Sequence, residues 1–387
     1  MFGDEPLISN KYWSNAMKEA GFHSDSFMST HYDIINRRED FDRYYDELSL
    51  TPFRILNTQL NKYLAFLVIL FKYDILHVSF VGILRFSPLL KRVEHLFYFL
   101  SDIKIINLFF GGDYYRYSKV VDESWRHGLL SHYPDMAKLE HKTEKNVAYW
   151  NKHSDCIIGG LIMDGNGRWD ILPFNAITID EDTWKVESKI YNDSNGATKP
   201  VKIVHSPNHR VIKGTEYIIQ AVDELKKEGY NIDFILLEKK QNEEVKQILS
   251  EADILVEQII LGYGLNGIEG MALGLPVCTN IPDTLFSKVF SRYSYINKCP
   301  IVQTSPETIK ENLKRLIEHP ELRKQLGQMS RIYVEKYHSK KTAILMFSRI
   351  YRKIWFNEDI DVMNYFHPVI GQYEGDFQNF DRTFGNI

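Results

Sequence analysis

The sequence predicts an α/β protein built from two doubly wound domains, and three observations support that fold class. The chain has 387 residues, which is long for one domain and enough for two that each bury a core. Short apolar runs alternate with segments of helical periodicity in both halves. A polar stretch with loop composition, residues 178–200, separates the halves. We therefore expect one Rossmann-like domain over residues 1–185 and a second over residues 186–339.

The first half is expected to alternate between strands and helices. Its predicted strands are 75–80, 104–110, 155–158 and 169–173. Its predicted helical segments are 12–20, 56–71 and 88–100. In the segment 88–100, five apolar residues recur at helical spacing and are expected to face the core: Leu89, Leu90, Val93, Leu96 and Phe97.

The second half has the more regular pattern. Its predicted strands are 201–205, 232–237, 253–257 and one that begins at Pro276. Its predicted helices are 214–227, 242–250, a short helix that carries Glu269, 306–318, 320–337 and 340–355. Because strands and helices alternate, we expect a parallel sheet that binds its ligands beyond the carboxyl ends of the strands.

A glycine-rich turn, from Gly262 to Gly267, joins the third of these strands to the short helix that carries Glu269. Glycines before a helix let the backbone approach a ligand closely, and the free N–H groups of the helix start favour an anion. A phosphate-bearing ligand fits that arrangement, and Glu269 can accept hydrogen bonds from the ligand's hydroxyl groups. The alternative is an ordinary strand-turn-helix junction whose glycines only turn the chain.

The stretch from Gly264 to Val277, GLNGIEGMALGLPV, resembles the donor-site signature of GT-B glycosyltransferases, specifically the retaining family 4. In that family a glutamate follows a glycine-rich turn and precedes the pattern A-x-G-x-P-V. The resemblance implies that Glu269 holds the ribose of a nucleotide-diphosphate sugar. The other donor-binding residues that it implies in this turn are Gly264, Leu265, Asn266 and Gly267. The family carries a further glutamate earlier in the turn, where this chain has Leu261.

The same resemblance implies the arrangement of the whole chain. GT-B enzymes have two Rossmann-like domains that face a cleft, and the first binds the acceptor while the second binds the nucleotide sugar. Their last helix, here residues 340–356, crosses back to complete the first domain. Residues 357–387 are left as a tail that is polar and aromatic and has no clear periodicity.

The segment between the strand 201–205 and the helix 214–227 begins at His205 and contains Arg210 and Lys213. A doubly wound sheet presents ligand contacts here, and a lysine just before a helix can reach a diphosphate. The family carries a Lys-Gly pair at this point, with an arginine a few residues earlier, where this chain has Pro207 and Asn208. We expect Lys213 and Arg210 to be catalytic and His205 to contact the donor. The alternative is a helix start on a solvated loop.

A second turn, Gly111-Gly112-Asp113, follows the strand 104–110 and resembles the family's G-x-D turn, which faces the donor across the cleft. The resemblance implies that Asp113 is catalytic and that Gly112 contacts the donor. Some relatives carry a histidine just before this turn, where this chain has Phe110. The alternative is that Asp113 only caps the segment that follows. The nearby His127 and His132 are expected to be structural.

Composition excludes several classes of protein. A net charge of -4 provides no broad basic surface for nucleic acid. Three widely spaced cysteines lack metal-ligand spacing and suggest reduced thiols in the cytoplasm. The start of the chain lacks the pattern of a signal peptide, and the longest apolar run, 63–71, is far shorter than a membrane span. The Asp-x-Asp pairs at 40/42, 180/182 and 359/361 follow no predicted strand, so no metal and no cofactor are expected.

The predicted function is transfer of a sugar from a nucleotide-diphosphate sugar to a hydroxyl of a glycan or lipid-linked acceptor, without metal and with retention. Two alternatives stay open: a non-catalytic GT-B partner or glycan-binding protein, and an epimerase of the same fold. A further alternative concerns location. Helical spacing places Lys91, Arg92 and His95 on the outer side of the segment 88–100, with Tyr98 and Phe99 at its edge. Such a surface can bind the protein to an anionic membrane, here to its inner face. An enzyme with a soluble acceptor would need no such contact.

Overall fold

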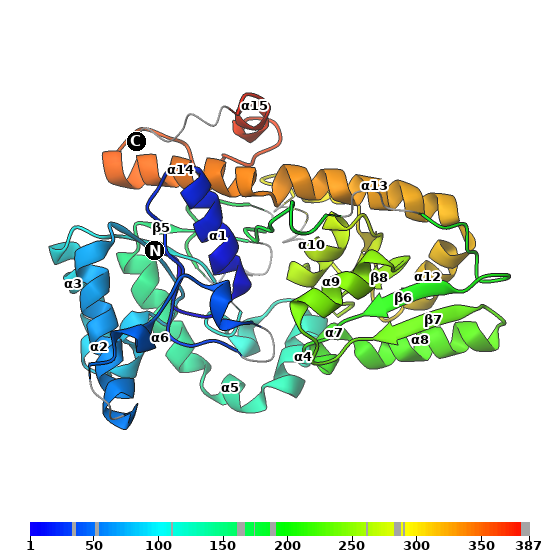
Figure 1. Ribbon diagram of the computed structural model, residues 1–387, viewed down its shortest axis with the longest axis horizontal. Helices are drawn as coiled ribbons and strands as arrows, with labels where there is room; N and C mark the ends of the chain where they lie inside the picture. The colour runs from blue at the N-terminus through cyan, green and yellow to red at the C-terminus, as the bar shows by residue number, and fades with distance from the viewer. Residues whose placement is uncertain are drawn as a thin grey trace. The chain divides into compact units, whose positions relative to one another are not determined.

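The chain divides into two compact units in the computed structural model (Figure 1). The structure describes residues 1–32, 36–50, 54–109, 111–160, 167–173, 175–185, 191–260, 262–281, 288 and 291–380. Unit 1 consists of Met1–Arg116, Leu139–Thr178 and Lys340–Ile387, and unit 2 of Tyr117–Lys138 and Ile179–Ser339. Each unit contains one parallel sheet with helices packed on it, as the sequence predicts.

In unit 1 the sheet has the order β3-β4-β5, with all neighbours parallel. Its strands are β3 (Ile75–Val78), β4 (Lys104–Asn107) and β5 (Cys156–Ile157), and a separate parallel pair is formed by β1 (Phe27–Met28) and β2 (Arg43–Tyr44). The predicted strand at 169–173 is wrong, because only a single bridge, Ile158 to Ile171, joins that segment to the sheet. The side chain of Asp170 instead accepts a hydrogen bond from the Ile157 N–H at 2.7 Å, which ends the ladder there.

The helices of unit 1 surround this sheet and include the C-terminal helix. The α-helices are α1 (Ile8–Glu19), α2 (Arg54–Lys72), α3 (Glu94–Leu100), α6 (Glu140–His153), α14 (Lys340–Phe356) and α15 (Tyr373–Gln378). The 3-10 turns are η1 (Arg38–Asp40), η2 (Tyr45–Leu48), η3 (Ile83–Phe86) and η4 (Leu90–Arg92). Helix α14 lies against α1 (Figure 1), and Lys340 forms an ion pair with Glu19 at 2.9 Å. The expected return of the last helix to the first unit is therefore confirmed.

The segment 88–100 differs from the predicted amphipathic helix. It is divided at Val93 into η4 and α3, and the residues of α3 that are buried are Glu94 and Tyr98. The Glu94 carboxylate accepts hydrogen bonds from the Ile83 and Leu84 N–H groups at 2.8 and 3.1 Å and from the Tyr98 hydroxyl at 2.7 Å. These bonds fix Glu94 inside, and the expected inner face is only partly correct, because Leu90 and Phe97 pack against the core of unit 1 whereas the other three residues are exposed. Leu89 is 74% exposed and Leu96 46% exposed.

In unit 2 five parallel strands have the order β10-β9-β8-β6-β7. They are β6 (Val201–His205), β7 (Ile232–Leu236), β8 (Ile254–Val256), β9 (Val277–Thr279) and β10 (Val302–Gln303). The chain moves from β6 to one neighbour, β7, and then to the opposite neighbour, β8. The strand order therefore reverses between β6 and β8, which is where doubly wound sheets bind their ligands.

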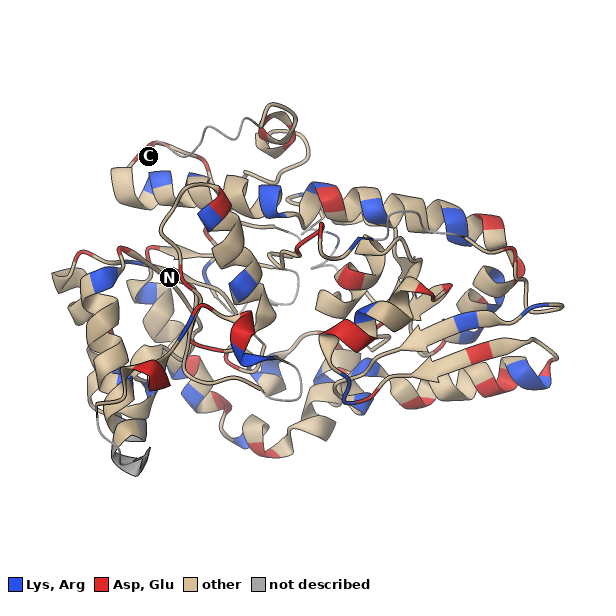
Figure 2. Cartoon of the chain, in the orientation of Figure 1, with Lys and Arg blue, Asp and Glu red and all other residues tan. Residues whose placement is uncertain are grey.

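Helices of unit 2 cover its sheet and close its core. They are α4 (Glu123–His132), α5 (Pro134–Lys138), α7 (Arg210–Lys213), α8 (Thr215–Lys227), α9 (Asn242–Ser250), α10 (Leu265–Ala272), α12 (Ile309–Glu318) and α13 (Pro320–Tyr337), with 3-10 turns η5 (Tyr117–Lys119) and η7 (Ile296–Lys298). Helices α8 and α12 pack against each other and on alternate residues of β6, including Val201 and Ile203. Figure 2 shows both basic and acidic residues along α8.

One part of unit 2 comes from the first half of the sequence. Residues 117–138 follow β4 of unit 1 in the chain but belong with unit 2. Helix α4 packs against α7, and Trp125 and Leu129 on α4 are buried. The side chain of Asp122 caps α4 by accepting a hydrogen bond from the Trp125 N–H at 2.8 Å. Unit 2 is therefore assembled from two separate stretches of sequence.

Candidate functional site

The residues that the sequence predicts for donor binding, except Gly112, gather at the strand-order reversal of unit 2. His205 ends β6 and pairs in register with Val256, which ends β8. Helix α7 with Lys213 follows β6, and Glu257 follows β8 directly. Beyond β8 the chain enters the glycine-rich turn and then α10, which carries Glu269. The carboxyl ends of two adjacent strands thus supply the polar groups of one site.

Lys213 lies at the end of α7 and forms a buried ion pair. Its Nζ contacts Glu257 Oε1, and the two side chains are 11% and 0% exposed. The next residue, Gly214, has φ 75°, and a Cβ there would lie 2.6 Å from Ile259 Cγ1. Glycine is required at this position both by the left-handed backbone and by the close neighbour. The Lys213-Gly214 pair therefore sets a sharp turn that directs the lysine inward.

Glu257 is the residue of this site that the sequence analysis missed. Its Oε2 accepts a hydrogen bond from Thr279 Oγ1 at 3.1 Å, and its N–H donates to the Cys278 carbonyl at 2.8 Å. A Cβ on Gly264 would lie 3.3 Å from Glu257 Oε1, so the carboxylate lies beside the start of α10. One signal in the sequence points to it: an acidic residue directly after a buried strand of a parallel sheet.

The start of α10 offers free hydrogen-bond donors next to this carboxylate. The helix begins after Gly264, which has no side chain to cap it. The first N–H groups of a helix have no partner within the helix. In the part of the chain that the structure describes, those of Leu265, Asn266 and Gly267 have no acceptor. These are the backbone groups predicted to bind the donor, and they remain available to an anion.

Glu269 lies one turn further along α10 and is 3% exposed. Burial raises its pKa to about 8, a shift that a hydrogen bond from Asn266 and the Lys213 charge oppose and that the Glu257 charge increases. Its Oε1 is buried and has no hydrogen-bond partner among the described residues. A buried carboxyl oxygen without a partner is costly unless a ligand supplies a donor. Glu269 is therefore placed to bind a group that the free protein lacks.

His205 is fixed by the chain on both sides. Its Nδ1 lies 2.8 Å from the Val256 carbonyl and its Nε2 2.9 Å from Thr215 Oγ1. Desolvation lowers its pKa to about 4, so the ring is neutral at pH 7. The carbonyl can only accept, so Nδ1 carries the proton and Nε2 accepts from the Thr215 hydroxyl. His205 thus links β6, β8 and α8, and its contact with a donor stays a prediction.

Arg210 lies one turn before Lys213 on α7 but on the exposed side. Its guanidinium contacts Glu216 at 2.8 Å and Glu238 at 3.0 Å, and its side chain is 39% exposed. Among the described residues the structure records no contact between Arg210 and the pair of Lys213 and Glu257. Its role as a second diphosphate ligand stays a prediction.

Asp113 and Gly112 belong to unit 1, in the turn after β4. Asp113 Oδ2 accepts a hydrogen bond from the Phe80 N–H at 3.1 Å, which ties this turn to the one after β3. The Tyr114 N–H bonds to the Gly111 carbonyl at 3.0 Å. Gly112 is exposed in the turn, and Phe110 lies outside the described residues. Their roles toward a donor stay predictions.

A cluster of rings beside α7 was also missed. His132 Nε2 lies 3.1 Å from His209 Nδ1, and the Tyr133 hydroxyl lies 3.1 Å from His209 Nε2. His209 immediately precedes α7, while the other two residues end α4. The cluster joins residues more than seventy positions apart in sequence, and no local sequence pattern predicts such a contact. It fixes the start of the segment that carries Lys213.

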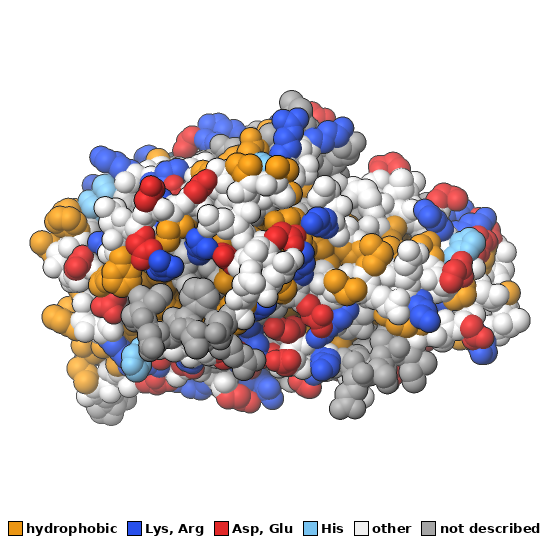
Figure 3. Space-filling model, turned by 90° about the horizontal axis from the view of Figure 1, so that it is seen from above, with side chains coloured by type: hydrophobic (Ala, Val, Ile, Leu, Met, Phe, Trp, Pro, Cys, Tyr) orange, Lys and Arg blue, Asp and Glu red, His pale blue; other side chains and the backbone are white. Residues whose placement is uncertain are grey.

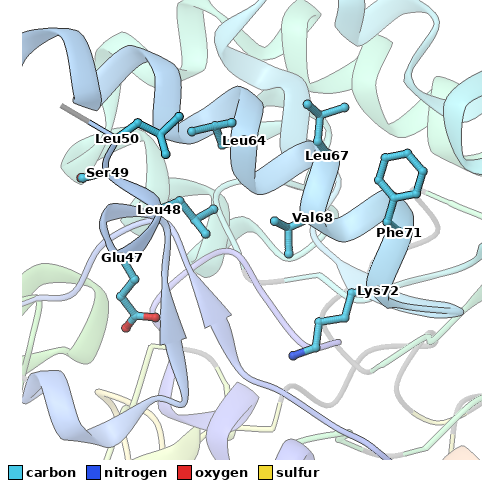
Figure 4. A pocket seen from close by; sticks show the side chains of 9 residues that line it. All are labelled: Glu47, Leu48, Ser49, Leu50, Leu64, Leu67, Val68, Phe71 and Lys72. Carbon is cyan, nitrogen blue, oxygen red and sulfur yellow. The ribbon is translucent and has the colours of Figure 1, made fainter.

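The hollow that the structure records in unit 1 is of a different kind. It has a volume of about 570 Å³ and lies along α2 (Figure 4). It is lined by Glu47, Leu48, Ser49, Leu50, Leu64, Leu67, Val68, Phe71 and Lys72. The lining is almost entirely aliphatic and aromatic, so it lacks the convergent polar groups of a nucleotide site.

Comparison with known families and structures finds proteins that this chain resembles. Residues 197–332, which include Lys213, Glu257 and Glu269, match the family described as glycosyl transferases group 1. Comparison with curated protein sequences gives no match.

Solved structures with the same fold include HepE of Anabaena in complex with UDP-glucose. That chain is 10% identical, with 90% of this chain and 97% of HepE covered and a TM-score of 0.52. HepE in complex with UDP gives a TM-score of 0.53 at the same identity and coverage. At this identity the likeness concerns the fold. The chain therefore has the GT-B fold, and its residues 197–332 match the glycosyl transferases group 1 family.

Proposed function

We propose that the protein transfers a sugar from a nucleotide-diphosphate sugar to a hydroxyl group of an acceptor. The observation that supports this proposal is that one site contains both hydrogen-bond donors and a buried acceptor that have no partner among the described residues. The start of α10 has free N–H donors for a diphosphate, and Glu269 has a buried oxygen that lacks a donor such as a ribose hydroxyl. A nucleotide sugar supplies both groups. UDP-sugars are the first donors to test, because HepE binds UDP-glucose.

The proposed chemistry retains the configuration of the sugar. The bond between the anomeric carbon and the phosphate oxygen breaks, and the acceptor oxygen bonds to that carbon on the same face. The acceptor's proton passes to the departing phosphate oxygen. Lys213 and the N–H groups at the start of α10 stabilise the charge that develops on the diphosphate. Arg210 adds a further positive charge to this set if its ion pairs open.

Direct assay of donors tests the proposed function. The protein is incubated with UDP-, GDP- and ADP-sugars, and release of nucleoside diphosphate is measured with and without oligosaccharide acceptors. We expect slow hydrolysis of one donor class and thermal stabilisation by the matching nucleoside diphosphate. Binding without hydrolysis or transfer would instead support the non-catalytic GT-B protein, and interconversion of the sugar without an acceptor would support the epimerase. Absence of binding by all three classes would contradict the proposal.

Removal of divalent cations is expected to leave the transfer rate largely unchanged. The physical reason is that Lys213 and the start of α10 can offset the diphosphate charge without a metal. The measurement compares initial rates in excess EDTA with rates in added magnesium or manganese. A rate that disappears in EDTA and returns with either ion would show that the diphosphate is neutralised by metal instead.

We further propose that the acceptor is a glycan or a lipid-linked saccharide at the cytoplasmic face of a membrane. The described part of the chain contains no helix that is long and apolar enough to cross a bilayer. Its three unpaired cysteines fit a reducing compartment. A surface of unit 1, formed by η4 and α3, exposes Leu89, Phe99 and Leu100 at 74%, 78% and 79%. Figure 3 shows hydrophobic side chains at the end of the molecule where Figure 1 places α2 and α3.

Two exposed basic residues, Lys91 and Arg92, lie on η4 within this surface. Exposed apolar side chains beside basic ones suit the interface of an anionic bilayer. Leu89 and Leu96, which helical spacing places on the inner side, are exposed and add apolar side chains to this surface. His95 contributes less, since its Nδ1 lies 2.7 Å from the Tyr149 hydroxyl.

Co-sedimentation with vesicles tests the membrane contact. The wild type is expected to bind vesicles that contain phosphatidylglycerol, and the Lys91→Glu/Arg92→Glu variant to bind at least about tenfold more weakly, since each basic residue near such a surface contributes about 1 kcal/mol. Lys226→Glu/Lys227→Glu on α8 is the matched control, because it makes the same change of charge on exposed residues of unit 2. Equal and negligible binding by all three proteins would leave a soluble acceptor.

A further inference from the structure

We infer that Glu257 limits how tightly the site holds the nucleoside diphosphate, acting as a fixed negative charge that offsets Lys213 beside the start of α10. This inference rests on the proposed function, since it assigns Lys213 and α10 to the diphosphate. It concerns a residue outside the predicted donor set. It also explains why a lysine expected to meet phosphate is buried in an ion pair within the protein itself.

The position of Glu257 indicates that its carboxylate stays in place when a ligand arrives. One oxygen contacts Lys213 Nζ and the other accepts from Thr279 Oγ1, whose own side chain is buried. Its side chain lies against α10, where a Cβ on Gly267 would be 3.4 Å from Glu257 Cγ. With its backbone N–H also bonded to Cys278, the residue is held by β9, α10 and α7 together. The Glu257 side chain is therefore a fixed part of the site.

The charges of this cluster cancel in the free protein. Lys213 and Glu257 form one buried pair, and Glu269 is largely protonated at pH 7 because its pKa is raised to about 8. The free N–H groups of α10 therefore present partial positive charge next to a neutral cluster. Removing the Glu257 charge while keeping its shape would leave Lys213 as an uncompensated cation beside those groups.

The consequence falls mainly on the product of the reaction. A nucleoside diphosphate carries more negative charge than its sugar ester, because its terminal phosphate is no longer esterified. A site with an uncompensated lysine would hold this product more tightly than the donor, and turnover would become limited by product release. Glu257 prevents this imbalance. It is a positioning and charge-setting residue that acts through Lys213, and it need not touch the sugar.

Calorimetric titration of the Glu257→Gln variant with UDP tests the inference. Glutamine keeps the shape, and its oxygen can still accept from Lys213. Its NH2 group then faces Thr279 Oγ1, which can accept from it because the Thr279 hydroxyl has the Gly262 carbonyl as its own acceptor. The Kd for UDP is expected to fall by about tenfold or more, because one opposing charge near the phosphates is lost. The Kd for UDP-glucose is expected to fall less, and competition by uridine to stay unchanged. Steady-state inhibition by UDP should strengthen to the same degree. Equal or weaker binding of UDP by the variant would overturn the inference.

If Glu257→Gln does not fold, a double variant tests the same inference. In Lys213→Gln/Glu257→Gln no buried charge is left without its partner. This protein is expected to bind UDP at least about tenfold more tightly than the Lys213→Gln single variant, in which the Glu257 charge opposes the phosphates without a partner. Equal binding by these two variants would show that Glu257 does not oppose the charge of the diphosphate. The proposed function fails separately: a wild type that binds no nucleoside diphosphate contradicts that function before any variant is compared.

Discussion

Replacing Lys213 with alanine is expected to lower kcat/KM by roughly two to three decades. The Lys213 ammonium lies beside the start of α10, where the leaving diphosphate gains charge as the sugar bond breaks. A charge-assisted contact that strengthens during bond breaking stabilises the transition state more than the bound donor. We therefore expect the loss to appear in kcat as well as in kcat/KM, measured with saturating acceptor.

The same substitution removes the partner of a buried carboxylate, so stability must be measured beside activity. An unpaired buried charge costs about 3–5 kcal/mol. Rates should therefore be compared at a temperature where circular dichroism shows both proteins folded. Lys240→Ala is the matched control, because Lys240 pairs with Glu244 on the surface of unit 2 and is 43% exposed. An unchanged rate in Lys213→Ala would show that this lysine serves the fold alone.

Glu269→Gln is expected to weaken donor binding and to remove its dependence on pH. The free protein holds Glu269 protonated up to a pKa of about 8, whereas hydrogen bonds from ribose hydroxyls favour the carboxylate and lower that pKa. Donor binding at pH 7 should thus release a proton. The affinity of the wild type for UDP-glucose is expected to rise between pH 6 and pH 8, and that of the glutamine variant to stay flat.

Calorimetry in buffers of different ionisation enthalpy measures the released proton directly. The stability of the free protein provides a second readout with the opposite slope. A raised pKa means that the folded state holds the proton while the unfolded carboxyl, near 4.5, has lost it. The contribution of Glu269 to stability is therefore full below pH 4.5 and is lost as pH rises toward 8. Identical pH profiles in the wild type and Glu269→Gln, for both binding and melting, would contradict the assignment.

The sequence predicts four of the five strands in the sheet of unit 2, because these elements have strong local signals, and it misses the two-residue strand β10. Strand β6 (Val201–His205) and helix α9 (Asn242–Ser250) have the predicted bounds, as does α13 (Pro320–Tyr337). Apolar runs and amphipathic helices alternate there without interruption, so local pattern and packing agree. The glycines before α10 likewise mark the turn that the structure contains.

Prediction fails where a polar group decides burial. In the segment 88–100 the periodicity of the leucines favours one face, but Glu94 is 1% exposed because it satisfies two backbone N–H groups of η3. The pattern of apolar residues cannot show that a carboxylate must be buried in order to accept backbone hydrogen bonds. Three hydrogen bonds to Glu94 outweigh the burial that Leu96 loses, so Leu96 faces solvent while Phe97 stays packed against the core.

The candidate site shows the same limit at longer range. Lys213 and Glu269 were expected from their motifs, whereas Glu257 was not, since its meaning depends on a contact with Lys213 across the sheet. From sequence alone, a lysine before a helix is expected to face solvent, because the position of the opposing carboxylate is not known. Sequence therefore predicts which groups can bind a diphosphate, and the structure adds which charge opposes them.

The division of unit 2 into two stretches of sequence affects how this unit can be isolated. A recombinant fragment limited to residues 179–339 would contain the whole family match yet lack α4, whose Trp125 and Leu129 are buried within the unit. Without α4, the side of α7 that packs against it would be exposed. His209 would also lose its contacts with His132 and Tyr133, directly before the helix that carries Lys213. Residues 117–138 would have to be supplied as a separate peptide, or joined to the fragment by a linker. The boundary of homology is thus not the boundary of autonomous folding.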